Sequence, residues 1–186
     1  MLKELLQWDR DTFIYLNNLG VEKYDTFWLV ITNFSTWIPL FLLILFLIFW
    51  KNNREQRLWV FLTFLSMLLV VVSVIFITKF GVGRLRPNND PAINSLIRVV
   101  QSPRGYSFFS GHAASSFSIA TLAVLFFRMK HRWIYIILLW PILFSISRIY
   151  LGVHYPIDIL VGTLVGVFFA SFFYKMHKRF KAPYIT

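Results

Sequence analysis

Residues 59–78, WVFLTFLSMLLVVVSVIFIT, contain no charged side chain and decide the fold. A helix of about 20 apolar residues crosses the roughly 30 Å hydrocarbon core of a bilayer, so this stretch predicts a membrane-spanning helix. The composition agrees, because 58% of the 186 residues are hydrophobic and only 15% are charged. Since a soluble domain has about 25% charged residues, the composition excludes a soluble globular domain and a disordered chain.

Four further apolar stretches extend the prediction to about five spans, or six: 27–50, 111–127, 133–146 and 157–174. Residues 2–19 differ, because apolar side chains recur there at helical spacing among charged ones, which predicts an interfacial amphipathic helix. The segment lacks the features of a signal peptide, so we expect it to stay on the mature protein. The expected fold is all-α, a polytopic membrane helix bundle in one domain, 1–186, with an interfacial segment at 1–23.

Positively charged residues in the loops predict the orientation. They gather in three segments at alternate connections: 51–57, 128–132 and 175–181. The opposite side carries nearly as many, but three of those, Lys79, Arg86 and Arg148, have a chemical use described below. Because cytoplasmic loops are enriched in Lys and Arg, we expect the three segments and the C-terminus in the cytoplasm. The connections 79–110 and 147–156 then share the outer face.

The first cluster of polar residues at a span end is KFGVGRLRP, residues 79–87. Its glycines permit a tight turn that brings Lys79, Arg84 and Arg86 into one loop. Arginine offers a planar fork that matches phosphate oxygens, and lysine adds a compact charge. In isolation the cluster also fits cations that snorkel to lipid headgroups.

The second cluster is Ser110-Gly111-His112, directly before an apolar stretch. Ser110 suits a helix N-cap, which leaves the backbone N–H groups of Gly111 and His112 at the positive end of a helix dipole, where anions bind. An imidazole at that position can also pass a proton to a leaving group. The alternative is a plain helix cap beside an interfacial histidine.

The third cluster runs from Ser147-Arg148 through His154 to Asp158. Pro156 fits the start of the last helix, which places Asp158 in its first turn, four residues after His154. A carboxylate there can accept a hydrogen from one imidazole nitrogen, so that the other presents its lone pair. Such an oriented histidine is a nucleophile or a base. The alternative role of Asp158 is to complement the helix dipole.

The predicted topology brings the three clusters to one face, where cations, helix N-termini, two histidines and one carboxylate would surround one point. A phosphoryl group fits this set, because its oxygens need cations and N–H groups, and its transfer needs a nucleophile and a proton donor. Two histidines and one acid among so many cations make a poor divalent site, so we expect no metal and no cofactor.

These motifs resemble those of the type 2 phosphatidic acid phosphatase (PAP2) family, which shares its active site with vanadium haloperoxidases. The family signature is Lys-x6-Arg-Pro, Pro-Ser-Gly-His and Ser-Arg-x5-His-x3-Asp, and residues 79–158 match its spacing. Two features differ from the family pattern. Phe109 replaces the proline of the second motif, and membrane members often have six spans.

The resemblance implies an activity and a set of roles. His154, oriented by Asp158, would attack phosphorus and form a phosphohistidine, and His112 would protonate the leaving group. The phosphoryl oxygens would be held by five residues: Lys79, Arg86, Ser110, Gly111 and Arg148. Arg84 lies outside the minimal signature and is expected to act from behind the site or on a headgroup.

The sequence therefore predicts a metal-independent lipid phosphate or pyrophosphate phosphatase at the outer leaflet of a bacterial-type plasma membrane. The candidate substrates are phosphatidylglycerol phosphate, phosphatidic acid, undecaprenyl pyrophosphate and the phosphates of lipid A. The alternatives are a lipid phosphotransferase with the same phosphohistidine and a non-enzymatic protein that binds phosphate headgroups. No nucleic-acid partner is expected. The small residues Gly162 and Gly166 indicate close helix packing, within the chain or in a homodimer.

Overall fold

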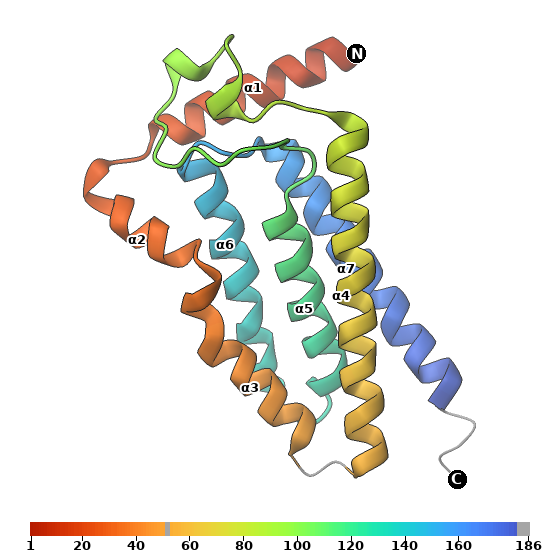
Figure 1. The fold of residues 1–186 in the computed structure, drawn as a ribbon. Helices are drawn as coiled ribbons and strands as arrows, with labels where there is room; N and C mark the ends of the chain where they lie inside the picture. The colour runs from red at the N-terminus through yellow and green to blue at the C-terminus, as the bar shows by residue number, and fades with distance from the viewer. Residues whose placement is uncertain (51–52, 182–186) are drawn as a thin grey trace.

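The computed structural model describes residues 1–50 and 53–181, and every regular element in this part of the chain is a helix. Long helices run side by side in a bundle, and α1 (Leu2–Asn18) lies across one end of it (Figure 1). The predicted all-α fold is confirmed. The segment 1–23 differs in detail, because α1 ends at Asn18 and a short 3-10 turn, Glu22–Tyr24, follows.

The first predicted span is not one continuous helix. Residues 25–49 form three pieces: α2 (Asp25–Ile31), η2 (Phe34–Trp37) and α3 (Ile38–Phe49). The two halves are bent by 60°. Two local signals explain the break: the Asn33 side chain accepts a hydrogen bond from the Ser35 N–H, and Pro39 stands in the first turn of α3. Both are features of a helix start. The apolar stretch 27–50 is therefore helical on both sides of a break at its polar residues.

The other predicted spans are helical, and most extend beyond the apolar stretch. They are α4 (Arg54–Val82), α5 (Gly111–Phe127), η5 (Arg132–Leu138) continuing into α6 (Leu139–Tyr150), and α7 (Pro156–Lys181). Hydropathy marks only the lipid-solvated part of a helix, whereas polar residues with a good cap continue it into the headgroup region. Asn53 caps the start of α4, and Gly83, at φ 64°, ends it.

The number of spans is a separate question. By length and composition α4, α7 and the pair η5–α6 are long enough to cross a bilayer, and the bent pair of helices adds a fourth span if its two halves cross as one. The 17-residue α5 is the fifth apolar helix. It coincides with the stretch 111–127 that the sequence indicates. A total of five spans stays a prediction.

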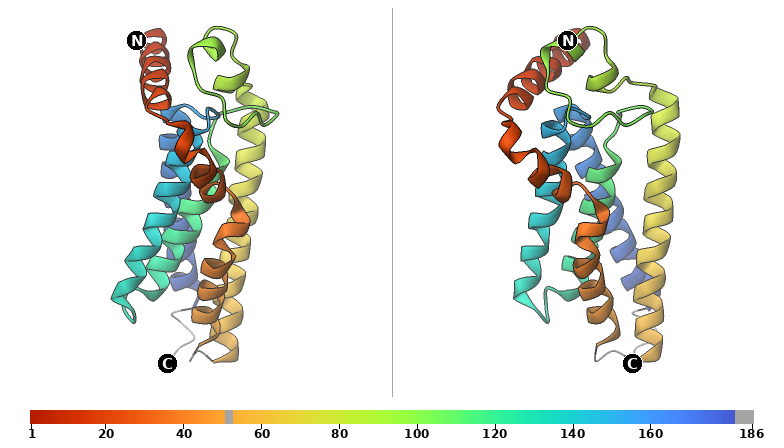
Figure 2. Two further views of the ribbon diagram at one scale, coloured as in Figure 1. Left: turned by 90° about the vertical axis from the view of Figure 1, so that its left-hand side faces the viewer. Right: turned by 60° about the vertical axis from the view of Figure 1, so that its left-hand side comes forward.

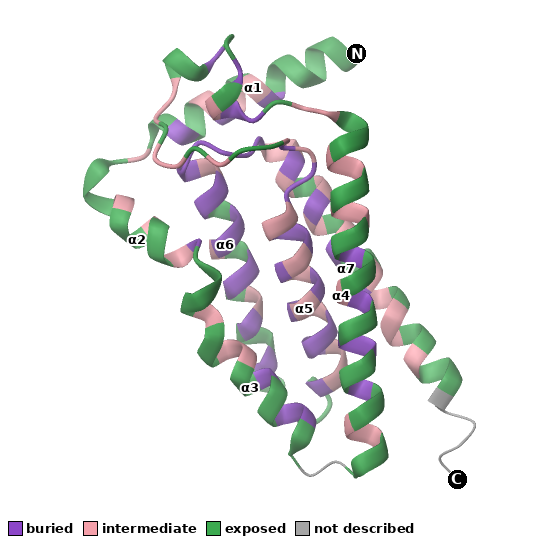
Figure 3. Cartoon of the chain, viewed as in Figure 1, coloured by how far each residue is buried: buried purple, intermediate pink, exposed green. Residues whose placement is uncertain are grey.

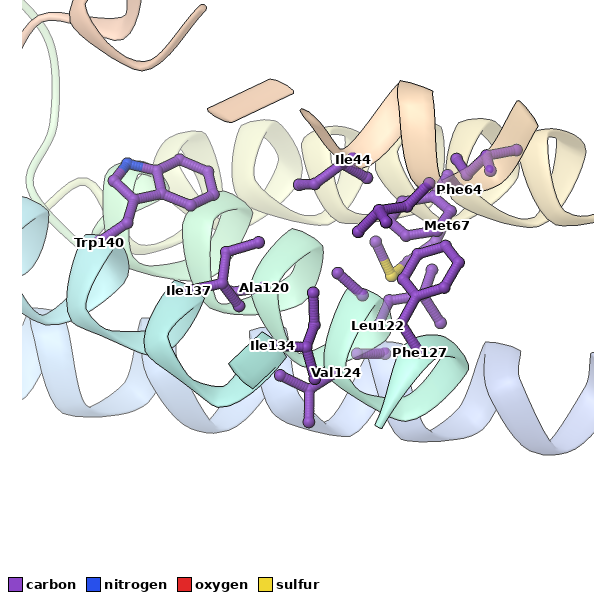
Figure 4. Close-up of a cluster of buried hydrophobic side chains, with 14 of the residues drawn as sticks. Ile44, Phe64, Met67, Ala120, Leu122, Val124, Phe127, Ile134, Ile137 and Trp140 are labelled. Carbon is purple, nitrogen blue, oxygen red and sulfur yellow. The ribbon is translucent and has the colours of Figure 1, made fainter. Parts of the chain in front are cut away.

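The helix α5 forms the centre of the bundle, between α4, α6 and α7 (Figures 1 and 2). Burial follows this arrangement, since buried residues concentrate on α5 and on the faces turned toward it (Figure 3). Figure 4 shows part of this core, in which Met67 of α4 lies near Leu122 and Phe127 of α5. Large apolar side chains such as Phe76 and Ile77 remain exposed, as expected for helix faces in contact with lipid.

Small residues allow α7 to approach α5 closely. A Cβ atom on Gly162 would lie 2.6 Å from the Ser110 carbonyl oxygen, and one on Gly166 would lie 2.4 Å from that of Ala114. Both distances are shorter than any real contact, so these positions require glycine. The two glycines serve packing within the chain, and the alternative of a homodimer through them gains no support.

The loop 83–110 and α1 cover the same end of the bundle. Short 3-10 turns, Pro87–Asn89 and Asn94–Leu96, lie in this loop. The buried Asn17 anchors α1, because its amide group donates to the carbonyls of Arg98 and Ile149 and accepts from the Arg98 N–H at 2.7 Å. The end of the bundle that carries α1 is therefore a packed layer, not a set of free loops.

Candidate active site

Four helix ends meet at the end of the bundle that α1 covers (Figures 1 and 2). They are the C-terminal ends of α4 and α6 and the N-terminal ends of α5 and α7. The three sequence clusters are located at these ends. A direct hydrogen bond joins two of them, because the backbone N–H of Ser110 donates to the backbone carbonyl of Asp158 at 2.9 Å. The structure thus brings the clusters together as the topology predicts.

His154 lies against Asp158 at the start of α7. The distance from its Nδ1 to Asp158 Oδ2 is 3.4 Å, a long hydrogen bond, and the Tyr155 N–H donates to the same oxygen at 3.0 Å. Both His154 and Asp158 are buried. Burial, reinforced by Arg86 and other nearby cations, holds the pKa of His154 well below its ordinary value. The imidazole is therefore neutral at pH 7. With the hydrogen on Nδ1, the lone pair lies on Nε2, where it accepts from Arg86, and it can attack once that donor turns to a ligand.

Two buried arginines border this histidine. Arg86 Nη1 lies 3.2 Å from His154 Nε2 and also donates to the Val153 carbonyl. Arg148 Nη1 donates to the Thr32 hydroxyl and, at 3.3 Å, to the side chain of Gln101. In the described part of the chain the Nε atoms of both arginines are buried without a hydrogen-bond partner. Buried N–H groups are rarely left unpaired, so these two are suited to donate to the oxygens of an anionic ligand.

Lys79 is held at the end of α4 by the loop. Its Nζ donates to the carbonyl oxygens of Tyr106 and Ser107, at 2.7 and 3.2 Å. Its positive charge is close enough to His154 to contribute to lowering the pKa of that histidine. Lys79 is therefore fixed beside the place where the sequence expects phosphoryl oxygens.

Ser110 caps α5 as expected, with its hydroxyl accepting from the Ala113 N–H at 3.4 Å. The first N–H groups of a helix have no partner within it, so those of Gly111 and His112 are available to an anion. The imidazole of His112 packs against two aromatic rings that also contact each other, with ring-centre distances of 5.2 Å to Phe34 and 4.8 Å to Phe144. Both rings restrict the orientation of the imidazole.

Arg84 makes contacts that the sequence does not predict. Its guanidinium bridges Asp158 Oδ1, at 2.9 Å, and Asp9 Oδ2 of α1, at 2.7 Å. Among the described residues no group of three or more His, Asp and Glu gathers that could hold a metal ion. The absence of a metal cofactor stays a prediction.

Comparison with known proteins identifies the family. The profile of the PAP2 superfamily matches residues 59–182. The chain belongs to the PAP2 superfamily. Its resemblance to that family is thereby confirmed, and the three PAP2 motifs, residues 79–158, lie within the matched region.

Relatives within the PAP2 superfamily cover nearly the whole chain. The lipid A 4'-phosphatase of Bacteroides thetaiotaomicron is 31% identical over 98% of this chain and 82% of its own. That of Porphyromonas gingivalis is 30% identical over 95% and 75%. Among solved structures, Aquifex aeolicus LpxE has a TM-score of 0.66 at 27% identity, over 89% of this chain and 93% of its own.

A second solved structure supports the PAP2 fold. It is the transmembrane PAP2 type phosphatidylglycerolphosphate phosphatase of Bacillus subtilis, with a TM-score of 0.72 over 98% of this chain and 88% of its own. At 19% identity this likeness concerns the fold alone. Together with the apolar helices, it identifies the chain as an integral membrane protein.

Several residues of this PAP2 site were beyond sequence reasoning. Thr32 and Gln101 hold Arg148, and Phe34 contacts His112, although all three lie outside the motifs. Thr32 and Phe34 lie at the break between α2 and α3. The one sequence signal for this segment is the run of polar residues inside an apolar stretch. That signal indicates a break in the helix, but it does not indicate which residues the break contacts.

Proposed function

We propose that this PAP2 protein is a metal-independent lipid phosphatase that uses His154 as its nucleophile. The observation that carries the proposal is the pair of buried, unpartnered arginine Nε atoms beside a neutral histidine. Cations that only bind headgroups need no oriented imidazole, whereas phosphoryl transfer needs both groups. The roles of the site residues follow from their positions.

In the first step Nε2 of His154 attacks phosphorus, a P–N bond forms and the bond to the leaving oxygen breaks. His112, protonated in the substrate complex because the bound phosphate offsets the charge of the nearby cations, gives its proton to that oxygen, so the lipid leaves as an alcohol or as a phosphate. The developing charge on the phosphoryl oxygens is stabilised by the cations Lys79, Arg86 and Arg148, by the Ser110 hydroxyl and by the Gly111 N–H. In the second step water attacks phosphorus while His112 accepts a proton, and the P–N bond breaks to release phosphate.

For the substrate we place the phosphate monoester of lipid A first. Two relatives that align with nearly the whole chain carry the name lipid A 4'-phosphatase. The undecaprenyl-diphosphatase of Sulfolobus acidocaldarius, 30% identical over 70% of this chain and 58% of its own, supports a polyprenyl pyrophosphate as the second candidate. All candidates share a phosphate at headgroup level and an apolar tail in the bilayer.

A lipid panel tests this function. The purified protein in detergent, with excess EDTA, is expected to release inorganic phosphate from lipid A, undecaprenyl pyrophosphate, phosphatidylglycerol phosphate or phosphatidic acid, with the highest kcat/KM on lipid A. Loss of activity on adding EDTA would contradict the metal-independent mechanism. Binding of these lipids without phosphate release would favour a headgroup-binding protein, and transfer of phosphate to an alcohol at the expense of release would favour a phosphotransferase.

We further propose that the protein lies in a bacterial plasma membrane with the site on the outer face and the C-terminus in the cytoplasm. The basic segments 51–57 and 128–132 support this orientation. Because the chain has no cysteine, a single introduced cysteine can report the orientation of the protein in the membrane. An impermeant thiol reagent added to intact cells is expected to label Ser95→Cys and not Met129→Cys, two exposed positions at opposite ends of the bundle. The reverse pattern would invert the orientation.

A further inference from the structure

The helix α1 places a carboxylate behind the proposed nucleophile. Asp9 is fully buried, although it belongs to an amphipathic helix whose other charged residues are mostly exposed. Its Oδ2 accepts from Arg84 at 2.7 Å, and its Oδ1 accepts from the Ile157 backbone N–H at 2.9 Å. Burial raises the pKa of the Asp9 carboxyl, and these two donors counteract the rise. The carboxylate thus depends on Arg84 and on α7 for its charge.

Arg84 is fixed on three sides. One amino group donates to Asp9, the other donates to Asp158 Oδ1 at 2.9 Å, and the guanidinium lies 3.8 Å from the ring centre of Tyr155. Arginine can bridge two carboxylates in this way because its donors form a rigid fork. As a result the two oxygens of Asp158 have separate partners, with Oδ1 facing Arg84 and Oδ2 facing His154.

The charge of Asp9 matters to His154. A single guanidinium beside Asp158 would neutralise that carboxylate and weaken it as an acceptor for the imidazole. A second carboxylate on the same guanidinium leaves the group of three with a net charge of −1. That charge stabilises the positive charge which the imidazole acquires when Nε2 bonds to phosphorus.

We infer that Asp9 is a positioning residue for the reaction: through Arg84 it holds Asp158 in place and preserves its charge toward His154. The interfacial helix α1 is then a part of the active site, although it carries none of the family motifs. This inference rests on the proposed role of His154. Asp9 itself touches neither the nucleophile nor the phosphoryl position.

The variant Asp9→Asn tests the inference. The amide retains an oxygen for the Ile157 N–H and loses the charge that balances Arg84. We expect kcat on the best lipid substrate to fall roughly 10- to 100-fold, the size of effect that misplacement of a reacting group produces, while KM changes less than about twofold. The acid limb of the kcat/KM profile should move to lower pH, because loss of a nearby negative charge lowers the pKa of His154.

The pH profile is interpretable because the charged and titratable groups near His154 are known: Lys79, Arg84, Arg86, His112, Arg148 and Asp158. None of them is altered in Asp9→Asn. The shift therefore reports on the charge at Asp9.

A matched control separates positioning from simple anchoring of α1. Asn17→Ala removes the other buried polar anchor of the same helix and leaves Arg84 untouched. It should lower the unfolding temperature and keep kcat within about threefold and the pH profile in place. Asp11 is exposed, so Asp11→Asn should leave the unfolding temperature, kcat and the pH profile unchanged. If Asn17→Ala and Asp9→Asn lose the same activity without a pH shift, Asp9 only anchors the helix and the inference is wrong.

A second variant guards against misfolding of Asp9→Asn. Arg84→Lys keeps one positive charge, but a single ammonium cannot replace the fork that joins both carboxylates. We expect a similar fall in kcat with KM retained, and wild-type kcat in a folded Arg84→Lys protein would overturn the inference. Failure of wild type to release phosphate from any lipid would instead contradict the proposed function, so the two failures are distinguishable.

Discussion

The His154→Ala variant should release no measurable phosphate from any lipid that the wild-type protein hydrolyses. We expect a loss of at least about 10³-fold in kcat, because the covalent pathway disappears with its nucleophile and water has no equivalent base at the same place. Substrate binding should persist, since the arginines and helix ends that hold the phosphate are unchanged. Phosphate release and lipid binding by the same preparation measure the two effects.

The matched control is His131→Ala. His131 follows α5 at the opposite end of the bundle, so its removal tests for the loss of a histidine without loss of the site. Wild-type activity is expected. If His154→Ala retains more than a few per cent of the activity of this control, His154 is not the nucleophile.

The second large effect is expected for His112→Ala, and it should depend on the leaving group. A general acid contributes about 10²- to 10⁴-fold, so hydrolysis of a lipid phosphate ester, whose alkoxide needs a proton, should fall by that amount. Release of p-nitrophenolate in the first turnover of p-nitrophenyl phosphate should fall much less, because p-nitrophenolate leaves without protonation.

The comparison of the two substrates isolates the proton transfer. Both bind through the same phosphoryl contacts, so damage to phosphate binding would slow both reactions equally. An equal loss in first-turnover cleavage of the lipid ester and of p-nitrophenyl phosphate would therefore exclude His112 as the general acid. The substitution also removes the ring contacts of His112 with Phe34 and Phe144, and a loss caused by that packing alone would slow both reactions.

Much of the fold was accessible from the sequence because lipid solvation imposes a simple rule. A stretch such as 59–78 must be helical, since every backbone polar group in a bilayer must be paired within its own segment. The rule says less about 27–50. Polar residues such as Asn33 indicate an interruption there, but only the structure shows that Asn33 and Pro39 start a new helix and that the segment bends by 60°.

The residues of the site also fall into two groups, those that the sequence indicated and those that it did not. Residues such as Lys79 and Arg148 were found because a charge at the end of an apolar helix is conspicuous. The residues that position them were not, because their role depends on contacts between distant segments. Asp9 is an example: on the polar face of an amphipathic helix a carboxylate looks solvated, and only the docking of α1 buries it against Arg84.

The central claim is that His154 accepts the phosphoryl group, and its most direct test is to capture that intermediate. The enzyme is mixed with its best lipid substrate, quenched in alkali, where phosphohistidine is stable, and digested for mass spectrometry. Our account predicts a phosphate on the peptide that contains His154, absent from His154→Ala and more abundant when water attack is slowed in His112→Ala with p-nitrophenyl phosphate. Phosphate on another residue, or rapid turnover with no phosphorylated peptide under any of these conditions, would contradict it.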